Sequence, residues 1–190
     1  MQRKINPLGK NHLKLSEGRA SLLKTRIKTA DPRLTYPKDT LFYTYRCIAG
    51  RPTIGDGIRV DLLPPQWQAR CASGITQDEC DELLEMKLRE FEIPLNRVFA
   101  KSNLNDNQFA ALVCFSFNLG LAWLYPRNKV AIGLKRIILD NPNNFLAIRK
   151  KMLEYSLFSN PAKNGAKEVH EVLFKRRKAE FNLYSTPCQC

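Results

Sequence analysis

Apolar residues recur at helical spacing after residue 75. Between residues 76 and 92 they fall on one side of a helix: Cys80, Leu83, Leu84, Leu88 and Phe91. The run Thr76-Gln77-Asp78-Glu79 predicts where this helix begins, because the threonine hydroxyl and the Glu79 carboxylate can each accept a backbone N–H of the first turn. Pro94 lacks the N–H that a helix interior uses, so we expect it to end this helix or to start the next element.

A second pattern, from Asn105 to Gly120, predicts the most buried helix. Polar residues open it, and Gly120 is its expected stop. Its apolar residues lie on most sides: Phe109, Ala110, Leu112, Val113 and Phe117. A helix that is apolar nearly all round is buried, so we expect it at the centre of a helical lobe.

Three further helices are expected towards the C-terminus, at residues 128–139, about 144–155 and 166–184, with a loop at 160–165. In the last of them the basic run from Lys175 to Lys178 is expected to face mostly outward. The apolar residues expected to face inward are Val169, Val172, Leu173 and Leu183.

The first 74 residues are patterned differently. We expect a short helix at residues 10–18, a basic amphipathic segment at 21–28 and a proline-containing loop at 31–40. Residues 41–45 are aromatic and β-prone and lead into residues 45–57, which combine β-forming residues with three glycines. Glycines this close together allow positive φ and the close approach of another chain, so this stretch predicts a tight hairpin lining a cleft. Residues 61–74 are expected to be irregular.

These patterns predict one domain over residues 1–190, of the α+β class and mainly helical. Residues 1–74 would form a small N-terminal lobe with the hairpin, and residues 75–190 a larger helical lobe. A chain of this length can bury a substantial core, and a cleft is expected between the two lobes.

The chain is strongly basic, with a net charge of +13 and a pI near 9.7. This balance indicates a polyanionic partner: a nucleic acid, an anionic membrane surface or an anionic cell-wall polymer. Nucleic-acid binding would need aromatic side chains set among basic ones on one surface. Phe42, Tyr43 and Tyr45 beside Arg46 are only a partial candidate, so no specific nucleic-acid partner is expected.

Cysteine and histidine are arranged unlike a metal site. Cys188-Gln189-Cys190 lacks the two-residue gap of a zinc knuckle, and the chain has only two histidines. We therefore expect no structural zinc site. Cys71 and Cys80 are candidates for a disulfide, which the sequence leaves open.

No targeting segment is apparent. Residues 1–15 are basic and polar, without the apolar run of a cleavable signal peptide. The longest apolar run, residues 109–125, contains Asn118 and Gly120 and carries helix-capping signals, which favours a buried helix over a membrane span.

Three residues are candidates for chemistry. Cleavage of a glycoside needs a proton donor at the leaving oxygen and a second group that handles water or the sugar cation. Glu17 is the candidate donor, and Cys47 and Thr53 lie in the hairpin. Taken singly, each also fits an ordinary role, as a surface carboxylate, a buried thiol and a strand residue.

Taken together, motifs in the same order from about residue 5 to 184 resemble the phage-type lysozymes, or endolysins, of glycoside hydrolase family 24. Residues 5–9 with Ser16-Glu17-Gly18 look like the family's opening, and residues 45–57 are similar to its hairpin. Cys47 and Thr53, separated by five residues, match the subgroup in which a cysteine replaces the usual aspartate. Further matches are residues 74–79, 106–112, 115–120 and 176–180.

The resemblance implies a lysozyme-like fold and a bacteriolytic, antimicrobial muramidase (EC 3.2.1.17) that needs neither metal nor cofactor. Glu17 would protonate the oxygen that bridges N-acetylmuramic acid and N-acetylglucosamine, and Thr53 would bind the attacking water. Cys47 would position water or tune polarity, because a thiol of ordinary pKa is mostly uncharged at neutral pH. The substrate-binding residues would be Tyr45, Gly55, Gly57 and Asn118.

The chain departs from the family pattern at two places. Glu17 and Cys47 have 29 residues between them, far more than in the family, which predicts an insertion at about residues 19–40. Asp56 and Ile58 replace an aromatic residue and a histidine or asparagine. If Glu17 is not the acid, Asp39 is the alternative.

The expected partners follow from the same resemblance. Peptidoglycan would be the substrate of a monomer made in the cytoplasm without a signal peptide, and a holin-like pore or delivery machinery would give access to the wall in the periplasm. The alternative hypothesis is a catalytically degenerate relative that binds cell-wall glycan or a protein partner.

Overall fold

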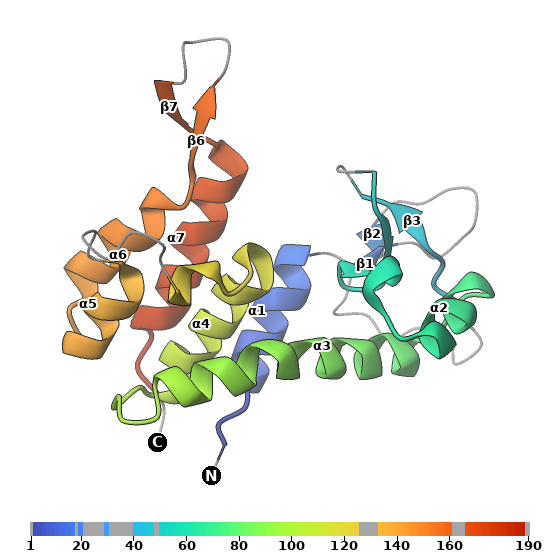
Figure 1. Ribbon diagram of the computed structural model, residues 1–190, viewed down its shortest axis with the longest axis horizontal. Helices are drawn as coiled ribbons and strands as arrows, with labels where there is room; N and C mark the ends of the chain where they lie inside the picture. The colour runs from blue at the N-terminus through green and yellow to red at the C-terminus, as the bar shows by residue number, and fades with distance from the viewer. Residues whose placement is uncertain are drawn as a thin grey trace. The chain divides into compact units, whose positions relative to one another are not determined.

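The computed structural model describes residues 2–17, 19–20, 29–30, 40–47, 50–125, 133–160 and 166–188 (Figure 1). The chain forms two compact units: unit 1 comprises residues 1–9 and 91–190, and unit 2 comprises residues 10–90. Two helices, α1 (Pro7–Glu17) and α3 (Gln77–Val98), contribute residues to both units. The expected lobes divide the chain near residue 74, whereas the boundary between these units lies inside α3.

Unit 2 is built on a small antiparallel sheet. Its strands are β3 (Tyr45–Arg46), β4 (Pro52–Ile54) and β5 (Ile58–Arg59), hydrogen-bonded in that order. The 3-10 turn η1 (Val60–Leu62) and helix α2 (Pro65–Ala72) follow. The expectation that residues 61–74 are irregular is wrong for α2, because Pro65 occupies the start of a helix, where its fixed φ and missing N–H cost nothing.

The stretch predicted as an insertion is described only in part. β1 (Arg19–Ala20) and β2 (Thr29–Ala30) form a short antiparallel ladder in which Arg19 pairs with Ala30. The predicted amphipathic segment at residues 21–28 and most of the predicted loop at 31–40 lie outside the described residues.

Helix α3 begins as the sequence predicts. Thr76 N donates to Glu79 Oε2 at 2.7 Å, and Glu79 N donates to Thr76 Oγ1 at 3.3 Å, which completes the capping box. The prediction that Pro94 ends the helix is wrong, because α3 continues through Pro94 to Val98. One helical carbonyl near the proline, that of Glu92, accepts a second hydrogen bond from the Asn96 side chain at 2.9 Å.

Helix α4 (Asp106–Leu119) is the core of unit 1. Its N-terminus carries a capping box formed by Asn105 and Gln108, and Gly120 ends it with φ of 73°. Every residue from Asn107 to Ser116 is buried, which confirms the prediction of a central helix. Around it lie η2 (Ala122–Leu124), α5 (Leu134–Asp140), α6 (Phe145–Glu154) and α7 (Glu171–Ser185), of which α7 packs on α4 and α6.

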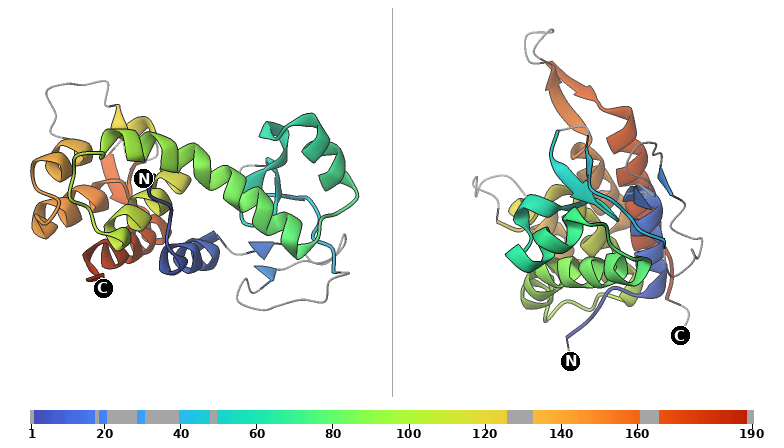
Figure 2. Two further views of the ribbon diagram at one scale, coloured as in Figure 1. Left: turned by 90° about the horizontal axis from the view of Figure 1, so that it is seen from below. Right: turned by 90° about the vertical axis from the view of Figure 1, so that its right-hand side faces the viewer.

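The segment before α7 differs from the prediction. Residues 166–169, expected to begin the last helix, instead form strand β7 (Ala166–Val169), which pairs with β6 (Leu157–Asn160) in an antiparallel ladder that extends away from the helices of unit 1 (Figures 1 and 2). Of the expected loop at residues 160–165, only Asn160 is described, and it ends β6. Val169 and Val172 are therefore 54% and 68% exposed rather than inward-facing. Arg177, expected on the outer face of α7, is fully buried.

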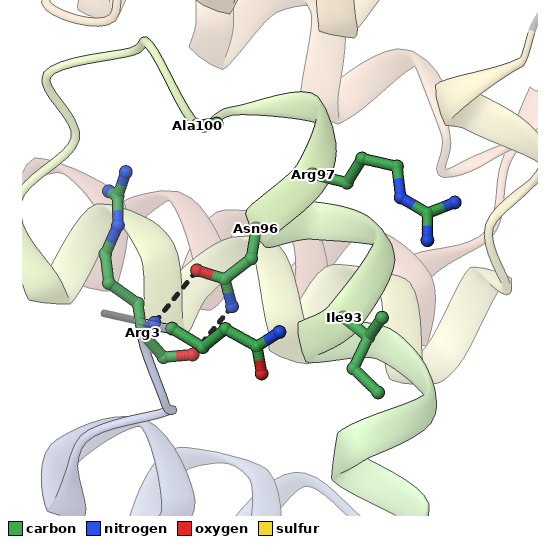
Figure 3. Close-up of a pocket in the computed structure, with 6 residues that line it drawn as sticks. Arg3, Ile93, Asn96, Arg97 and Ala100 are labelled. Carbon is green, nitrogen blue, oxygen red and sulfur yellow. Dashed lines mark hydrogen bonds between the residues drawn. The ribbon is translucent and has the colours of Figure 1, made fainter.

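The N-terminal segment belongs to unit 1 and lies along the C-terminal half of α3. Arg3 N donates to Asn96 Oδ1 at 2.9 Å, and Asn96 Nδ2 donates to Arg3 O at 2.7 Å (Figure 3). These residues line a cavity of about 630 Å³ together with Gln2, Ile93, Arg97 and Ala100. No side chain in its lining is an acid, so it has no group for the proton donor that glycoside cleavage requires.

Candidate functional site

Glu17 is the last residue of α1, and the helix is fixed within unit 2 by contacts with α3. Lys14 Nζ lies 2.7 Å from Asp81 Oδ1, and Lys10 pairs with Glu85. Leu13, on the same turn of α1, is fully buried. The last turn of the helix therefore holds the half-buried Glu17 in a defined place.

The Glu17 carboxylate lies against Gly57, in the turn between β4 and β5. Gly57 has φ of 82°, and a Cβ placed on it would come within 3.0 Å of Glu17 Oε2. A side chain at this position would be strained by the backbone conformation, and the carboxylate would have to shift by a few tenths of an ångström to make room for it. The glycine thus lets the hairpin approach the acid closely.

Tyr45, on β3, lies close to both the acid and the hairpin residues. Burial raises the pKa of its phenol first of all, and the nearby Glu17, Cys47 and Asp56 side chains raise it further, because each is negative at the alkaline pH where a phenol ionises. These three groups lie close enough to Tyr45 to act on its ionisation. The phenol therefore stays neutral and able to donate a hydrogen bond at neutral pH.

The backbone of the hairpin positions Cys47 and Thr53. Cys47 N donates to Arg51 O at 3.0 Å, and Gly50 N donates to Cys47 O at 2.7 Å, so the chain turns tightly after the thiol. Thr53 pairs with Tyr45 across the ladder, and its hydroxyl donates to Arg51 O at 3.0 Å. The hydroxyl oxygen of this buried threonine still has lone pairs that can accept a hydrogen bond from water.

Five of the predicted site residues therefore come together in unit 2: Glu17, Tyr45, Cys47, Thr53 and Gly57. Gly55, also predicted, has φ of 54°, and a Cβ there would lie 3.2 Å from the Cys80 sulfur, so it serves close packing. Asn118 lies in unit 1, at the last turn of α4. The alternative acid, Asp39, is outside the described residues.

Asp56 is a carboxylate beside the site to which the sequence assigns no role. It is fully buried between two glycines of positive φ, and it acts on Tyr45. The only sequence signal is an acid in a position that the lysozyme-like pattern fills with an aromatic residue. Ile58, where that pattern has a histidine or asparagine, belongs to the core with 2% of its surface exposed.

Three features are absent from the described part of the chain: a metal-binding cluster, a disulfide and a membrane-spanning helix. There, no three His, Cys, Asp or Glu side chains group closely enough to hold a metal ion. Cys71 and Cys80 are both buried, and no disulfide forms among the cysteines that the structure describes. No helix in the described ranges is long and apolar enough to cross a membrane.

The geometry suits acid-assisted hydrolysis. Glu17 can supply a proton, Thr53 can accept a hydrogen bond from water, and the Cys47 thiol is half-exposed nearby. A carboxyl group set against backbone and beside a neutral phenol is the kind of general acid that glycoside cleavage uses.

Two solved structures share the fold of this chain. The endolysin from Escherichia coli O157:H7 phage FAHEc1 has a TM-score of 0.67 and 21% identity, over 97% of this chain and 95% of that one. The muramidase domain of SpmX from Asticaccaulis excentricus has a TM-score of 0.63 and 22% identity, over 97% and 99%. These likenesses confirm the predicted lysozyme-like α+β fold. Among curated proteins none matches the chain.

A match at the level of the family covers most of the chain. The phage lysozyme family matches residues 42–180, which include Cys47 and Thr53 but not Glu17. Because the matched segment is well over half of the sequence, the chain belongs to the phage lysozyme family.

Proposed function

We propose that the protein is a muramidase of the endolysin type, which hydrolyses the β-1,4 bond between N-acetylmuramic acid and N-acetylglucosamine in peptidoglycan. Membership of the phage lysozyme family supports a glycoside hydrolase that acts on the cell wall. The observation that carries the proposal is the approach of the Glu17 carboxylate to Gly57, beside Tyr45. It brings the first candidate acid to the hairpin that carries Cys47 and Thr53.

In this proposal, Glu17 transfers its proton to the bridging oxygen as the glycosidic bond breaks. Water, bound by the Thr53 oxygen, adds to the sugar carbon, and the proton that it releases passes through solvent to the Glu17 carboxylate, which restores the acid. The Thr53 hydrogen is engaged by Arg51 O, so the threonine orients the water as an acceptor. Cys47 shapes the polarity beside this water, and the neutral Tyr45 phenol donates a hydrogen bond to the sugar or to Glu17.

The substrate is anionic, and the protein carries a net charge of +13. Long-range attraction would therefore concentrate the enzyme at the wall and weaken as salt screens it. We propose that it works as a monomer, made in the cytoplasm and released to the wall through a holin-like pore or delivered by other machinery.

The test compares Glu17→Gln with the wild type on purified peptidoglycan. The amide keeps the shape of the side chain but cannot donate the proton, so reducing-sugar release should fall by about 10²- to 10⁴-fold while the thermal unfolding temperature is unchanged. Glu90→Gln, which removes an exposed carboxylate of the same unit, is the matched control. Full activity of a folded Glu17→Gln variant would move the acid elsewhere, with Asp39 the next to test.

The same digest identifies the bond that is cut. After borohydride reduction of the products, a muramidase yields N-acetylmuramitol at the new ends, whereas a glucosaminidase yields N-acetylglucosaminitol. Mass spectrometry distinguishes the two, and the second product would contradict the proposed bond specificity.

A second candidate function is glycan binding without cleavage. Two observations favour it: the family match starts at residue 42, beyond Glu17, and Ile58 and Asp56 replace the family's usual residues in the hairpin. Sedimentation of the wild type with peptidoglycan, without release of reducing sugar at high protein concentration, would establish this function in place of the first.

A further inference from the structure

A buried ion pair lies directly against Asn118 in unit 1. Arg177 and Glu180, both on α7, have no exposed surface, and Arg177 Nη2 donates to Glu180 Oε1 at 2.6 Å. The same nitrogen donates to Asn118 Oδ1 at 2.9 Å. Arg177 Nη2 thus joins the end of α4 to the carboxylate on α7.

Two further contacts fix the guanidinium. Its central carbon lies 4.9 Å from the centre of the Phe115 ring, one turn before Asn118 on α4. Glu180 Oε1 also accepts from Arg176 Nε at 3.3 Å. Arg177 is therefore held by a charge on its own helix and by an aromatic face on the neighbouring helix.

This arrangement determines the orientation of the Asn118 carboxamide. A guanidinium has only donors, so the atom that faces Arg177 must be the carbonyl oxygen of the amide. The two N–H groups of Asn118 Nδ2 then point away from Arg177, and within the described part of the chain no group accepts from them. Asn118 is half-buried, so a ligand can reach it.

Stability alone is a weak explanation for the pair. Burying two charges is expensive, and well-packed apolar residues usually stabilise a core as well as a buried ion pair does. What apolar residues cannot do is hold a carboxamide in one of its two orientations. The pair is therefore better explained by what it does to Asn118.

We propose that Arg177, held by Glu180, is a positioning residue that presents the Asn118 amide N–H groups to the N-acetyl carbonyl of an amino sugar. A carbonyl oxygen only accepts hydrogen bonds, which matches a site that only donates. The inference rests on the proposed function, since it names a recognition element for the same class of substrate.

The direct test titrates ¹⁵N-labelled protein with the tetramer of N-acetylglucosamine and, separately, with the deacetylated tetramer of glucosamine. The Asn118 side-chain N–H signals should shift with the acetylated sugar and stay unchanged with the deacetylated one. Asn118→Asp keeps the acceptor for Arg177 but removes the donors, so its Kd for the acetylated tetramer should rise about tenfold without loss of stability.

The role of Arg177 is tested by the double variant Arg177→Met and Glu180→Leu, which replaces the pair by apolar residues of similar size and should fold. With Asn118 no longer oriented, KM for soluble, uncrosslinked peptidoglycan strands should rise about five- to tenfold at nearly unchanged kcat. Lys178→Met, on the exposed face of the same helix, is the matched control. A purely structural pair predicts an unchanged KM in the folded double variant, and that result would overturn the proposal.

The outcomes separate this inference from the proposed function. If the wild type cleaves peptidoglycan but Asn118→Asp binds the acetylated tetramer normally, the inference fails and the muramidase stands. If the wild type binds the acetylated tetramer through Asn118 but does not cleave, the inference stands and catalysis fails. No binding of the acetylated tetramer by the wild type overturns the inference.

Discussion

At the scale of single residues, Cys47 is the clearest departure from two-carboxylate chemistry. Its backbone N–H and carbonyl are both engaged in the hairpin turn, so the turn, rather than the thiol, fixes its place. A substitution of the side chain should therefore leave the geometry intact. The position is half-exposed and shares the Tyr45 environment with Glu17.

Cys47→Asp should therefore keep or raise the rate of peptidoglycan hydrolysis, because a carboxylate is ionised at neutral pH and orients water or a sugar cation more strongly than a thiol. The check is reducing-sugar release before and after treatment with iodoacetamide, which should inhibit the wild type and spare the variant. A variant that folds but is inactive would argue that Cys47 does not stand at the family's aspartate position.

Glu180 gives a prediction about pH. Burial raises the pKa of Glu180 from 4.5 to about 7, against the opposing charges of Arg177 and Arg176. Between these values the folded protein holds a proton that the unfolded chain releases, so the free energy of unfolding falls as pH rises through this window and levels off above about pH 7.

Relative to Glu180→Gln, which cannot titrate, the wild type should lose about 3 kcal/mol of unfolding free energy between pH 4.5 and 7. Urea unfolding across this range measures the difference. Glu171→Gln, exposed at the start of the same helix, is the control and should leave the pH profile unchanged. Parallel profiles for the wild type and Glu180→Gln would contradict the raised pKa.

At the level of secondary structure, two glycines of the hairpin share a positive φ, but only one of them lies against Glu17. Gly50 and Gly57 have φ of 72° and 82°, so alanine is strained by about 1–2 kcal/mol at either position. A Cβ on Gly57 meets Glu17 Oε2, whereas a Cβ on Gly50 meets nothing within 4 Å.

Gly50→Ala and Gly57→Ala should therefore lower the thermal unfolding temperature by similar amounts, but only Gly57→Ala should displace the acid. We expect at least a tenfold loss of hydrolysis for Gly57→Ala and a loss of less than about threefold for Gly50→Ala, since small misplacements of a catalytic group are costly. Equal activities in the two variants would mean that the approach of Glu17 to the hairpin is unimportant for the reaction.

Some helices and strands could be predicted from the sequence and others could not. Helix α4 and the start of α3 could be predicted because their signals are local: a capping box, an apolar run and a terminal glycine. The β6–β7 ladder could not, because Val169 fits the helical period of the residues that follow it and only pairing with Leu157 makes it part of a strand. The prediction that Pro94 ends α3 is wrong for a related reason. Whether a helix continues through a proline depends on the residues packed around it, which the sequence does not show.

In the candidate site too, the local features could be predicted from the sequence and the tertiary contacts could not. The motif places Cys47, Thr53 and the glycines correctly in one hairpin, since they are close in sequence. The approach of Glu17 to Gly57 depends on the packing of α1 against α3, and the burial of Arg177 on the packing of α7 against α4. Both depend on tertiary packing. From the sequence alone, a buried arginine within a basic run cannot be told from the exposed basic residues beside it.

At the scale of the whole molecule, the chain is not cut simply into a first and a second part. Residues 1–9 belong to unit 1 with residues 91–190, and residues 10–90 form unit 2 between them in sequence. Unit 1 is therefore completed by a short N-terminal segment that is far from the rest of the unit along the chain. The stability of unit 1 should depend on that segment.

The contacts of residues 1–9 indicate how much this segment stabilises unit 1. The Arg3 guanidinium donates to the carbonyls of Phe99 and Leu104, both at 3.1 Å, beyond the end of α3. Ile5 is 4% exposed, and its N–H donates to the buried Glu92 carboxylate at 2.8 Å. Lys4, between these two, is exposed.

Ile5→Ala should therefore lower the free energy of unfolding by about 2–5 kcal/mol, the range for truncating a buried aliphatic side chain. Arg3→Ala should lower it by about 1–3 kcal/mol, because three carbonyls beyond the end of α3, those of Phe99, Ser102 and Leu104, lose a charged donor. Lys4→Ala is the control and should stay within about 0.5 kcal/mol of the wild type. Urea unfolding gives the three values, and amide hydrogen exchange in α4 should quicken for Ile5→Ala and Arg3→Ala but not for the control. Equal stability of all three variants would show that the contacts of Arg3 and Ile5 do not stabilise unit 1.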